Sequence, residues 1–321
     1  MSPRQHRDVA ASVRQRLLNR ARERGEDFQL VLTYYAVERL LYRLSRSAHH
    51  ERFVLKGAML FSVWSGVPHR ATRDLDLLGH GDNAVSALER AFREICRTTV
   101  EEDGLEFLEE SVRGEEIRDE QDYQGVRLAF IARLAGARIP IRVDIGFGDA
   151  VSPPPETVKY PTLLDLPAPR LLAYPREGVV AEKFQTMVML GIANSRMRDF
   201  FDVWYLAQQF EFVGARLCGA IQATFGRRKT SLPPQAPLAL TAEFHGDRDK
   251  QLQWGAFLRR AGLDADRKTL PQVAESLRAF LLPPTAALAR SVPFDMIWSP
   301  GGPWRPVTSS RPRQPSTGRR A

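Results

Sequence analysis

The sequence predicts an α+β fold that has N-terminal helices, a small mixed sheet and a helical C-terminal lobe. Apolar residues recur at helical spacing from Val9 to about Arg46. Strand-like patterns dominate between residues 105 and 147, and helical spacing then returns as far as about Leu282. A chain of 321 residues is long enough to form about two domains.

The individual elements follow from local patterns. Gly25-Glu26-Asp27 separates two amphipathic helices, and the apolar run Phe53–Leu55 is followed by a short helical pattern that stops at Ser65-Gly66-Val67-Pro68. Residues 74–78 alternate apolar and acidic side chains like a half-buried strand, and residues 83–97 are typical of a helix. Residues 123–131 and 139–145 form a plausible hairpin around Ala135-Gly136-Ala137.

Composition suggests how the chain is divided and where it works. The Pro-rich stretch 152–156 suggests a division into a lobe at 1–150 and a helical lobe at 151–300, followed by a disordered basic tail at 301–321. No apolar run approaches the ~20 residues that span a bilayer, and the N-terminus lacks the apolar stretch of a signal peptide. Two cysteines beside apolar residues are typical of buried thiols in a reducing compartment, so we expect a cytoplasmic protein that has no membrane partner.

The charge of the chain is strongly basic. The net charge is +8, with 40 arginines and 6 lysines. Such a surplus favours polyanionic partners such as nucleic acid, although high arginine and low lysine can also reflect codon bias.

Two carboxylates occupy alternate positions of the predicted strand at 74–78. Asp74 and Asp76 therefore point to the same face and form a hard-oxygen pair suited to Mg²⁺ or Mn²⁺. Gly57 lies where the preceding short helix begins, and its missing Cβ lets a phosphate approach free backbone N–H groups. A metal and a phosphate cradle are the two parts that phosphoryl or nucleotidyl transfer needs.

A third acid, Asp144, stands within an apolar strand pattern and is predicted to complete the metal site from a neighbouring strand. Each piece has an ordinary alternative: paired acids on a solvated strand face, a glycine in a turn, and an aspartate at a strand end. The complete order is much rarer than any single piece. In it, the glycine and its helix are followed by a basic arm with Arg70, Thr72 and Arg73, then by the paired acids. This order favours a metal site.

A second group of polar residues lies beyond residue 180. Lys183 falls off the centre of the apolar stripe of its helix and could hold a triphosphate as a point charge. Asp199 and Asp202 are three residues apart on the next helix and share one face, where an aspartate could orient the lysine or an acceptor hydroxyl. The alternative is that Lys183 is a surface lysine and that the two acids lie in the first turn of a helix, where the helix dipole favours negative charge.

These residues resemble a known family. The resemblance rests on Leu55-Lys56-Gly57-Ala58 and on Arg70-Ala71-Thr72-Arg73-Asp74-Leu75-Asp76-Leu77, which are similar to the first motif of the AbiEii/AbiGii-type toxin nucleotidyltransferases of the DNA polymerase β-like superfamily. Lys183 and the segment Met197–Asp202 are similar to the later motifs of that family, and the resemblance extends through 254–257. Ala58 departs from the family pattern, which often has a second glycine or a serine there, and this implies weaker phosphate contacts at most.

The resemblance implies a sheet of the nucleotidyltransferase type and the transfer of NMP from an NTP to an RNA acceptor such as tRNA. It also implies that the chain is the toxin of a type IV toxin–antitoxin system, whose cognate antitoxin is encoded nearby. The implied catalytic residues are Asp74, Asp76, Lys183 and one of the two later aspartates, for which Asp199 is preferred to Asp202. The implied metal ligands are Asp74, Asp76 and Asp144, and the implied nucleotide-binding residues are Lys56, Gly57, Ala58, Thr72, Arg73 and Asp202.

Two other classes of function fit the same residues. One is a nucleotidyltransferase that modifies a small molecule or a protein. The other is a non-catalytic protein that retains the fold to bind RNA or a partner. The intact pair Asp74 and Asp76 argues against the second, and the basic charge leans weakly toward RNA.

Overall fold

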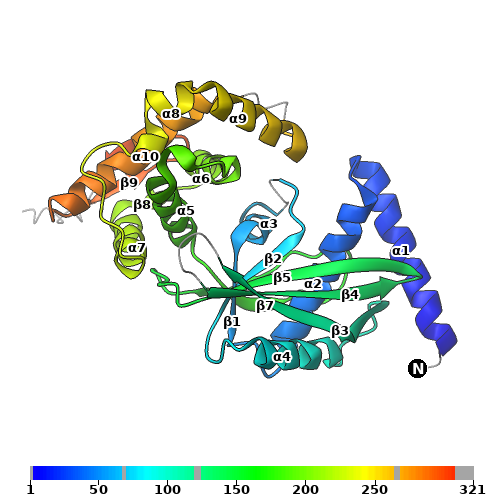
Figure 1. Cartoon of the computed structure of the whole chain (residues 1–321). Coiled ribbons are helices and arrows are strands. Elements are labelled where there is room, and N and C mark those ends of the chain that lie inside the picture. Colours follow the sequence, from blue (N-terminus) through cyan, green and yellow to red (C-terminus); the bar gives the residue numbers. More distant parts are fainter. Residues whose placement is uncertain (1–2, 67–69, 119–123, 264–267, 308–321) are drawn as a thin grey trace, which may run out of the picture.

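The computed structural model describes residues 3–66, 70–118, 124–263 and 268–307. A mixed seven-stranded sheet with N-terminal helices forms one lobe, and helices α5 to α10 gather in a second lobe beside it (Figure 1). The predicted α+β fold is confirmed.

Two helices open the chain as predicted. Helix α1 covers Pro3–Arg24 and α2 covers Phe28–Arg46, and Gly25 between them has a φ of +64°. The side chain of Asp27 caps α2 by accepting a hydrogen bond from the backbone N–H of Leu30 at 2.8 Å. Helix α2 packs against the sheet and α4, because its apolar stripe is almost completely buried.

The large sheet has the strand order β3-β4-β5-β2-β1-β7-β6. Strand β2 is antiparallel to β1 and parallel to β5, and β1 is parallel to β7, so the sheet is mixed as predicted. The strands are β1 Phe53–Lys56, β2 Asp74–Gly79, β3 Leu105–Arg118, β4 Gln124–Leu134, β5 Ala137–Phe147, β6 Glu156–Lys159 and β7 Arg170–Ala173.

The hairpin of β4 and β5 follows from its turn. Ala135 and Gly136 both have positive φ, at 47° and 82°, as the two central residues of a tight two-residue hairpin turn require. The turn fixes the register, in which Leu134 pairs with Ala137 and Arg127 pairs with Asp144. The predicted hairpin is confirmed, although Tyr123, where the strand was expected to begin, lies outside the described residues.

A short helical segment follows β1, and a longer helix follows β2. A 3-10 turn, η1, covers Gly57–Met59 and leads into the six-residue helix α3, Leu60–Ser65. Gly66 ends α3 in the left-handed conformation, with a φ of +74°, as the predicted stop indicated. Helix α4, Val85–Arg97, packs against β3 and α2 through its buried face.

The second lobe is helical as predicted. Its helices are α5 Arg176–Leu190, η2 Gly191–Ala193, α6 Met197–Gln209, α7 Gly214–Arg227, η3 Leu238–Leu240, α8 Ala242–Gly246, α9 Arg248–Ala261 and α10 Leu270–Ala289. A small sheet of the order β10-β9-β8 closes this lobe, with β8 Phe212–Val213, β9 Met296–Trp298 and β10 Trp304–Pro306. The ring of Phe280 on α10 contacts Phe212, Trp298 and Trp304.

Two details differ from the sequence-based expectation. Strands β6 and β7 belong to the large sheet, so the sheet continues past residue 150 to Ala173. The boundary at 150/151 therefore stays a proposal. Trp304–Pro306, part of the expected disordered tail, forms β10 because Trp304 packs on Phe280, whereas residues 308–321 lie outside the described residues. In the described parts of the chain, no helix has the length and apolar character needed to cross a membrane.

Candidate active site

A cleft of about 500 Å³ lies between the two lobes. Its walls come from β1, β2, β4 and β5 on the sheet side and from α5 and α6 on the helical side. All the site residues predicted from the sequence line this cleft except Arg73, which is exposed, and Asp202, which is buried behind the wall.

Strand β2 presents the predicted pair of acids to the cleft. Asp74 and Asp76 both line it, while Leu75 and Leu77 between and after them are completely buried on the opposite face. In the register of β2 and β5, Asp76 lies opposite Asp144 and Asp74 lies opposite Arg142. Nη1 of Arg142 lies 3.4 Å from Oδ1 of Asp74. The period-two pattern of the strand therefore brings the two acids together as the sequence predicted.

Gly57 lies directly beneath the carboxylate of Asp76. Lys56 pairs with Asp76 across β1 and β2, so the next residue approaches the acid closely. A Cβ added to Gly57 would be 2.0 Å from Oδ2 of Asp76 and 2.6 Å from its Cγ. The φ of Gly57 is +74°, which also favours glycine. The glycine is thus needed to seat Asp76, a role that sequence reasoning did not foresee.

The negative charge of Asp76 is destabilised where it stands. The pKa of Asp76 is raised from 3.8 to about 6. Burial is the largest cause, the charges of Asp144 and Asp74 act in the same direction, and Lys56 and Arg198 oppose the shift. A divalent cation would relieve this accumulation of negative charge, and carboxylate oxygens are the donors that Mg²⁺ and Mn²⁺ prefer. Asp74 and Asp76 therefore fit such an ion.

Asp144 is engaged by an arginine. Nε and Nη2 of Arg127 each donate to one oxygen of Asp144 at 2.8 Å, which forms a bidentate pair. Within the described ranges, no group of three or more His, Cys, Asp or Glu side chains is placed to hold a metal ion. Both oxygens of Asp144 therefore already accept hydrogen bonds from Arg127, and its role as a third metal ligand stays a prediction.

The opposite wall of the cleft carries Lys183 between two acids. Nζ of Lys183 lies 2.5 Å from Oδ1 of Asp199 and 2.9 Å from Oδ2 of Asp202. Burial alone would lower the pKa of Lys183, but Asp199 and Asp202 outweigh burial and raise it, so the side chain is a stable ammonium. The sequence predicted that the two acids share a face, and the structure shows both of them contacting the same lysine.

Sequence comparison identifies the family to which this chain belongs. The sequence matches the family described as "Nucleotidyl transferase AbiEii toxin, Type IV TA system" over residues 39–280, which is most of the chain. The chain belongs to the AbiEii nucleotidyltransferase toxin family. It is therefore a nucleotidyltransferase, and membership of the family implies an NTP substrate and a cognate antitoxin.

Two solved structures from Helicobacter pylori are more distantly similar. JHP933 is 14% identical, with a TM-score of 0.43, and the match covers 79% of this chain and 87% of that one. A candidate nucleotidyltransferase from H. pylori is 15% identical, with a TM-score of 0.44 and coverage of 80% and 95%. Likeness at this level carries no inference about activity. Comparison with curated proteins gives no match.

A further charged cluster of this AbiEii-family protein joins the lobes at Lys56. Nζ of Lys56 lies 2.8 Å from Oδ2 of Asp149 and 3.7 Å from Oε2 of Glu182 on α5. Arg228 contacts the same two acids, at 3.2 Å and 3.8 Å. Burial raises the pKa of Glu182, whose Oε1 has no hydrogen-bond partner among the described residues. Asp149, Glu182 and Arg228 were missed from the sequence, because only the packing of α5 and α7 on the sheet lobe brings them together.

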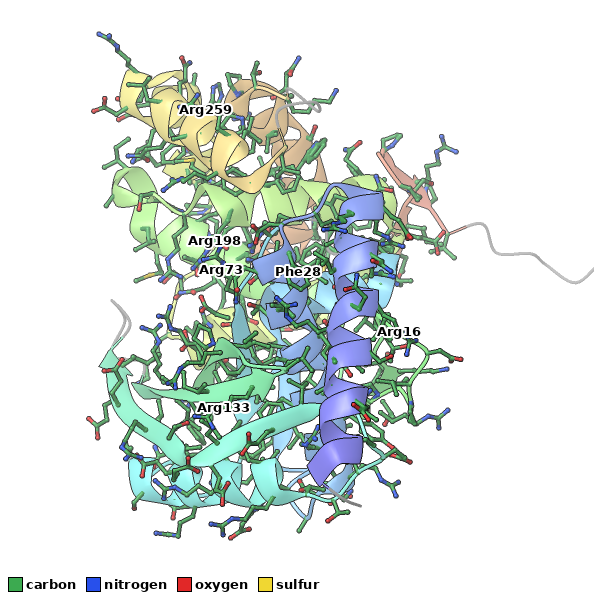
Figure 2. The ribbon with its side chains drawn as sticks, turned by 90° about the vertical axis from the view of Figure 1, so that its right-hand side faces the viewer. Arg16, Phe28, Arg73, Arg133, Arg198 and Arg259 are labelled. Atoms are coloured by element: carbon green, nitrogen blue, oxygen red, sulfur yellow. The ribbon has the colours of Figure 1, made fainter. Side chains whose placement is uncertain are left out.

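The remaining predicted residues lie in the cleft or beside it. The backbone N–H of Thr72 donates to the hydroxyl oxygen of Tyr34 on α2 at 3.1 Å, which holds the arm that precedes β2. Ala58 lines the cleft within η1, beside Gly57. Figure 2 places Arg73 and Arg198 at the junction of the two lobes, and both side chains are exposed.

Proposed function

We propose that the cleft transfers NMP from an NTP to a hydroxyl of an RNA acceptor, with tRNA as the acceptor class, and that the reaction depends on a divalent metal. The observation that carries the proposal is the pair Asp74 and Asp76, which faces Lys183 and Asp199 across one cleft. The first pair supplies oxygen donors for a cation and the second supplies an ammonium for phosphate. These are the two parts that phosphoryl-group transfer requires.

Asp74 and Asp76 would hold Mg²⁺ or Mn²⁺, which when bound neutralises phosphate charge and aligns the reacting oxygens. The protein residues position the reactants. The ammonium of Lys183 has three N–H donors. It donates to Oδ1 of Asp199 and forms an ion pair with Asp202. A further N–H is available to a phosphate oxygen. Asp199 holds Lys183 and, because it lines the cleft, can also orient the acceptor hydroxyl.

The bond changes follow from this placement. A bond forms between the acceptor oxygen and the α-phosphorus, and the hydroxyl proton passes to solvent. The bond between the α-phosphorus and the bridging oxygen breaks, and pyrophosphate leaves. Exposed Arg198 and partly buried Arg196 at the cleft supply positive charge for phosphates of the NTP or of the acceptor. The basic balance of the chain, with a net charge of +8, supports RNA over a neutral small molecule.

The test is transfer of label in vitro. Each of the four α-labelled NTPs is incubated with the protein, Mg²⁺ and total tRNA or cell lysate. Label in RNA supports the proposal, and label in protein or a small molecule overturns the RNA assignment. Asp76→Asn removes a proposed ligand and should abolish transfer, whereas Asp249→Asn, which changes an exposed aspartate on α9, should leave it unchanged. Transfer that persists at full rate with EDTA would refute the metal dependence.

We also propose that the activity makes the chain a toxin of the cytoplasm that is restrained by an antitoxin encoded nearby. The two cysteines, Cys96 and Cys218, are buried and unpaired, which agrees with a reducing compartment. Induced expression should stop growth, and Asp76→Asn should relieve the arrest. Toxicity that survives this substitution would refute an enzymatic origin.

A further inference from the structure

Arg70 connects the arm before β2 to the helical lobe. Its Nε lies 2.8 Å from Oδ1 of Asp202 and its Nη2 lies 2.9 Å from Oδ2, so the guanidinium and the carboxylate form a bidentate pair. Asp202 is completely buried on α6, and the Arg70 side chain is only 10% exposed. The pair therefore crosses between the lobes and is largely shielded from water.

The same carboxylate also holds the lysine of the active site. Oδ2 of Asp202 accepts from Nη2 of Arg70 at 2.9 Å and lies 2.9 Å from Nζ of Lys183. Asp199 contacts Nζ from the other side at 2.5 Å. Two cations and two anions thus form a neutral buried group, in which Asp202 is shared and Arg70 fixes both of its oxygens.

We propose that Arg70 is a positioning residue of the transfer reaction, which holds Lys183 for the triphosphate by fixing Asp202. This inference rests on the proposed function of the cleft. Removal of one cation leaves part of the charge of a buried carboxylate uncompensated. Without Arg70, Asp202 would be free to rotate and would draw the ammonium of Lys183 toward α6. The donor that Lys183 offers to a phosphate would then be misplaced.

Arg70 also lines the cleft, so a direct contact with the nucleotide is the rival explanation. A double-mutant cycle separates the two. KM for the NTP and kcat are measured for the native protein, Arg70→Gln, Asp202→Asn and the double variant. We expect Arg70→Gln to raise KM about tenfold in the native background and less than about threefold in the Asp202→Asn background. Equal factors in both backgrounds would overturn the proposal and indicate direct contact.

The conservative variant gives a second discrimination. Arg70→Lys keeps the charge but cannot bridge both oxygens of Asp202, so it should fail to restore KM. Rescue by Arg70→Lys would overturn the positioning role. Arg97→Gln is the matched control, because it breaks an arginine–carboxylate pair with Glu109 in which neither residue lines the cleft, and it should change neither constant.

A measurement that does not depend on turnover separates the positioning role of Arg70 from the proposed function of the cleft. The lysines are labelled by reductive ¹³C-methylation and titrated by NMR, with the signal of Lys183 assigned from Lys183→Arg. Because Arg70 lowers the pKa of Lys183, its removal should raise that pKa, and Arg97→Gln should not. An unshifted Lys183 in Arg70→Gln would overturn the positioning role. A shifted Lys183 in a protein that transfers no nucleotide would refute the proposed function alone.

Discussion

Replacing Gly57 by alanine should disable the site by displacing Asp76. The new Cβ would stand 2.0 Å from Oδ2 and 2.7 Å from Cβ of Asp76, far inside the contact distance of carbon and oxygen. The strand cannot move away, because β2 is paired on both sides, with β1 and β5. Rotation of the side chain relieves only the contact with the carboxylate, so the backbone at Gly57 must also shift, and both changes displace the carboxylate from its position in the cleft.

The loss in the free energy of unfolding of Gly57→Ala has two separable parts. Alanine at a φ of +74° loses about 1–2 kcal/mol of conformational energy. The forced rearrangement around Asp76 adds about 1–3 kcal/mol, the usual range for overpacking. Gly66 offers a matched control, because its φ is also +74° but a Cβ there would meet nothing within 4 Å. Gly66→Ala should show the first cost alone.

The assay combines urea unfolding with nucleotide transfer. We expect Gly57→Ala to be less stable than Gly66→Ala by about 1–3 kcal/mol and to lose on the order of a hundredfold in kcat/KM, as a displaced catalytic group does. Gly66→Ala should keep its activity. Equal stability of the two variants, or normal transfer by Gly57→Ala, would refute the argument that the glycine exists to seat Asp76.

Three further predictions concern buried acids. The pKa of Asp76 is raised from 3.8 to about 6 in the folded protein, so stability should fall as the pH rises through this interval, and Asp76→Asn should stabilise the metal-free protein at pH 8 by about 1–3 kcal/mol, as thermal unfolding would show. Burial likewise raises the pKa of Glu38 on α2 to about 7, so stability should fall as the pH rises from about 4.5 to 7, and urea unfolding of Glu38→Gln should lack this slope. Asp202→Asn should lower the free energy of unfolding by about 2–4 kcal/mol because it breaks a buried ion group, whereas Asp199→Asn should reduce transfer more than stability. A larger loss of stability in Asp199→Asn than in Asp202→Asn, or a larger loss of transfer in Asp202→Asn, would contradict this assignment.

Local patterns predicted much of the sheet lobe. The alternation at 74–78 placed both acids on one face, and the turn at Ala135 and Gly136 defined a hairpin. The same turn contained a signal that was not used. Counting outward from its two central residues pairs Arg127 with Asp144, so the arginine that engages this acid could have been inferred from the sequence.

Contacts between lobes could not be predicted in this way. Arg70 pairs with Asp202 of α6, which is 132 positions away in the chain, and Lys56 of β1 contacts Glu182 of α5. Their meeting depends on how α5 and α6 pack on the sheet lobe, which no local period encodes. Strand β7 was missed for a similar reason, because its pairing with β1 is parallel and spans more than a hundred residues.

The place of β2 inside the sheet has a consequence for motion. An interior strand exchanges its amide hydrogens only when large parts of the sheet open, so the amides of Leu75 and Leu77 should be among the slowest to exchange. The spacing of Asp74 and Asp76 is therefore as rigid as the sheet itself. Lys183 and Asp199 belong to the other lobe, so any adjustment that a bound nucleotide requires must come from the helical side of the cleft.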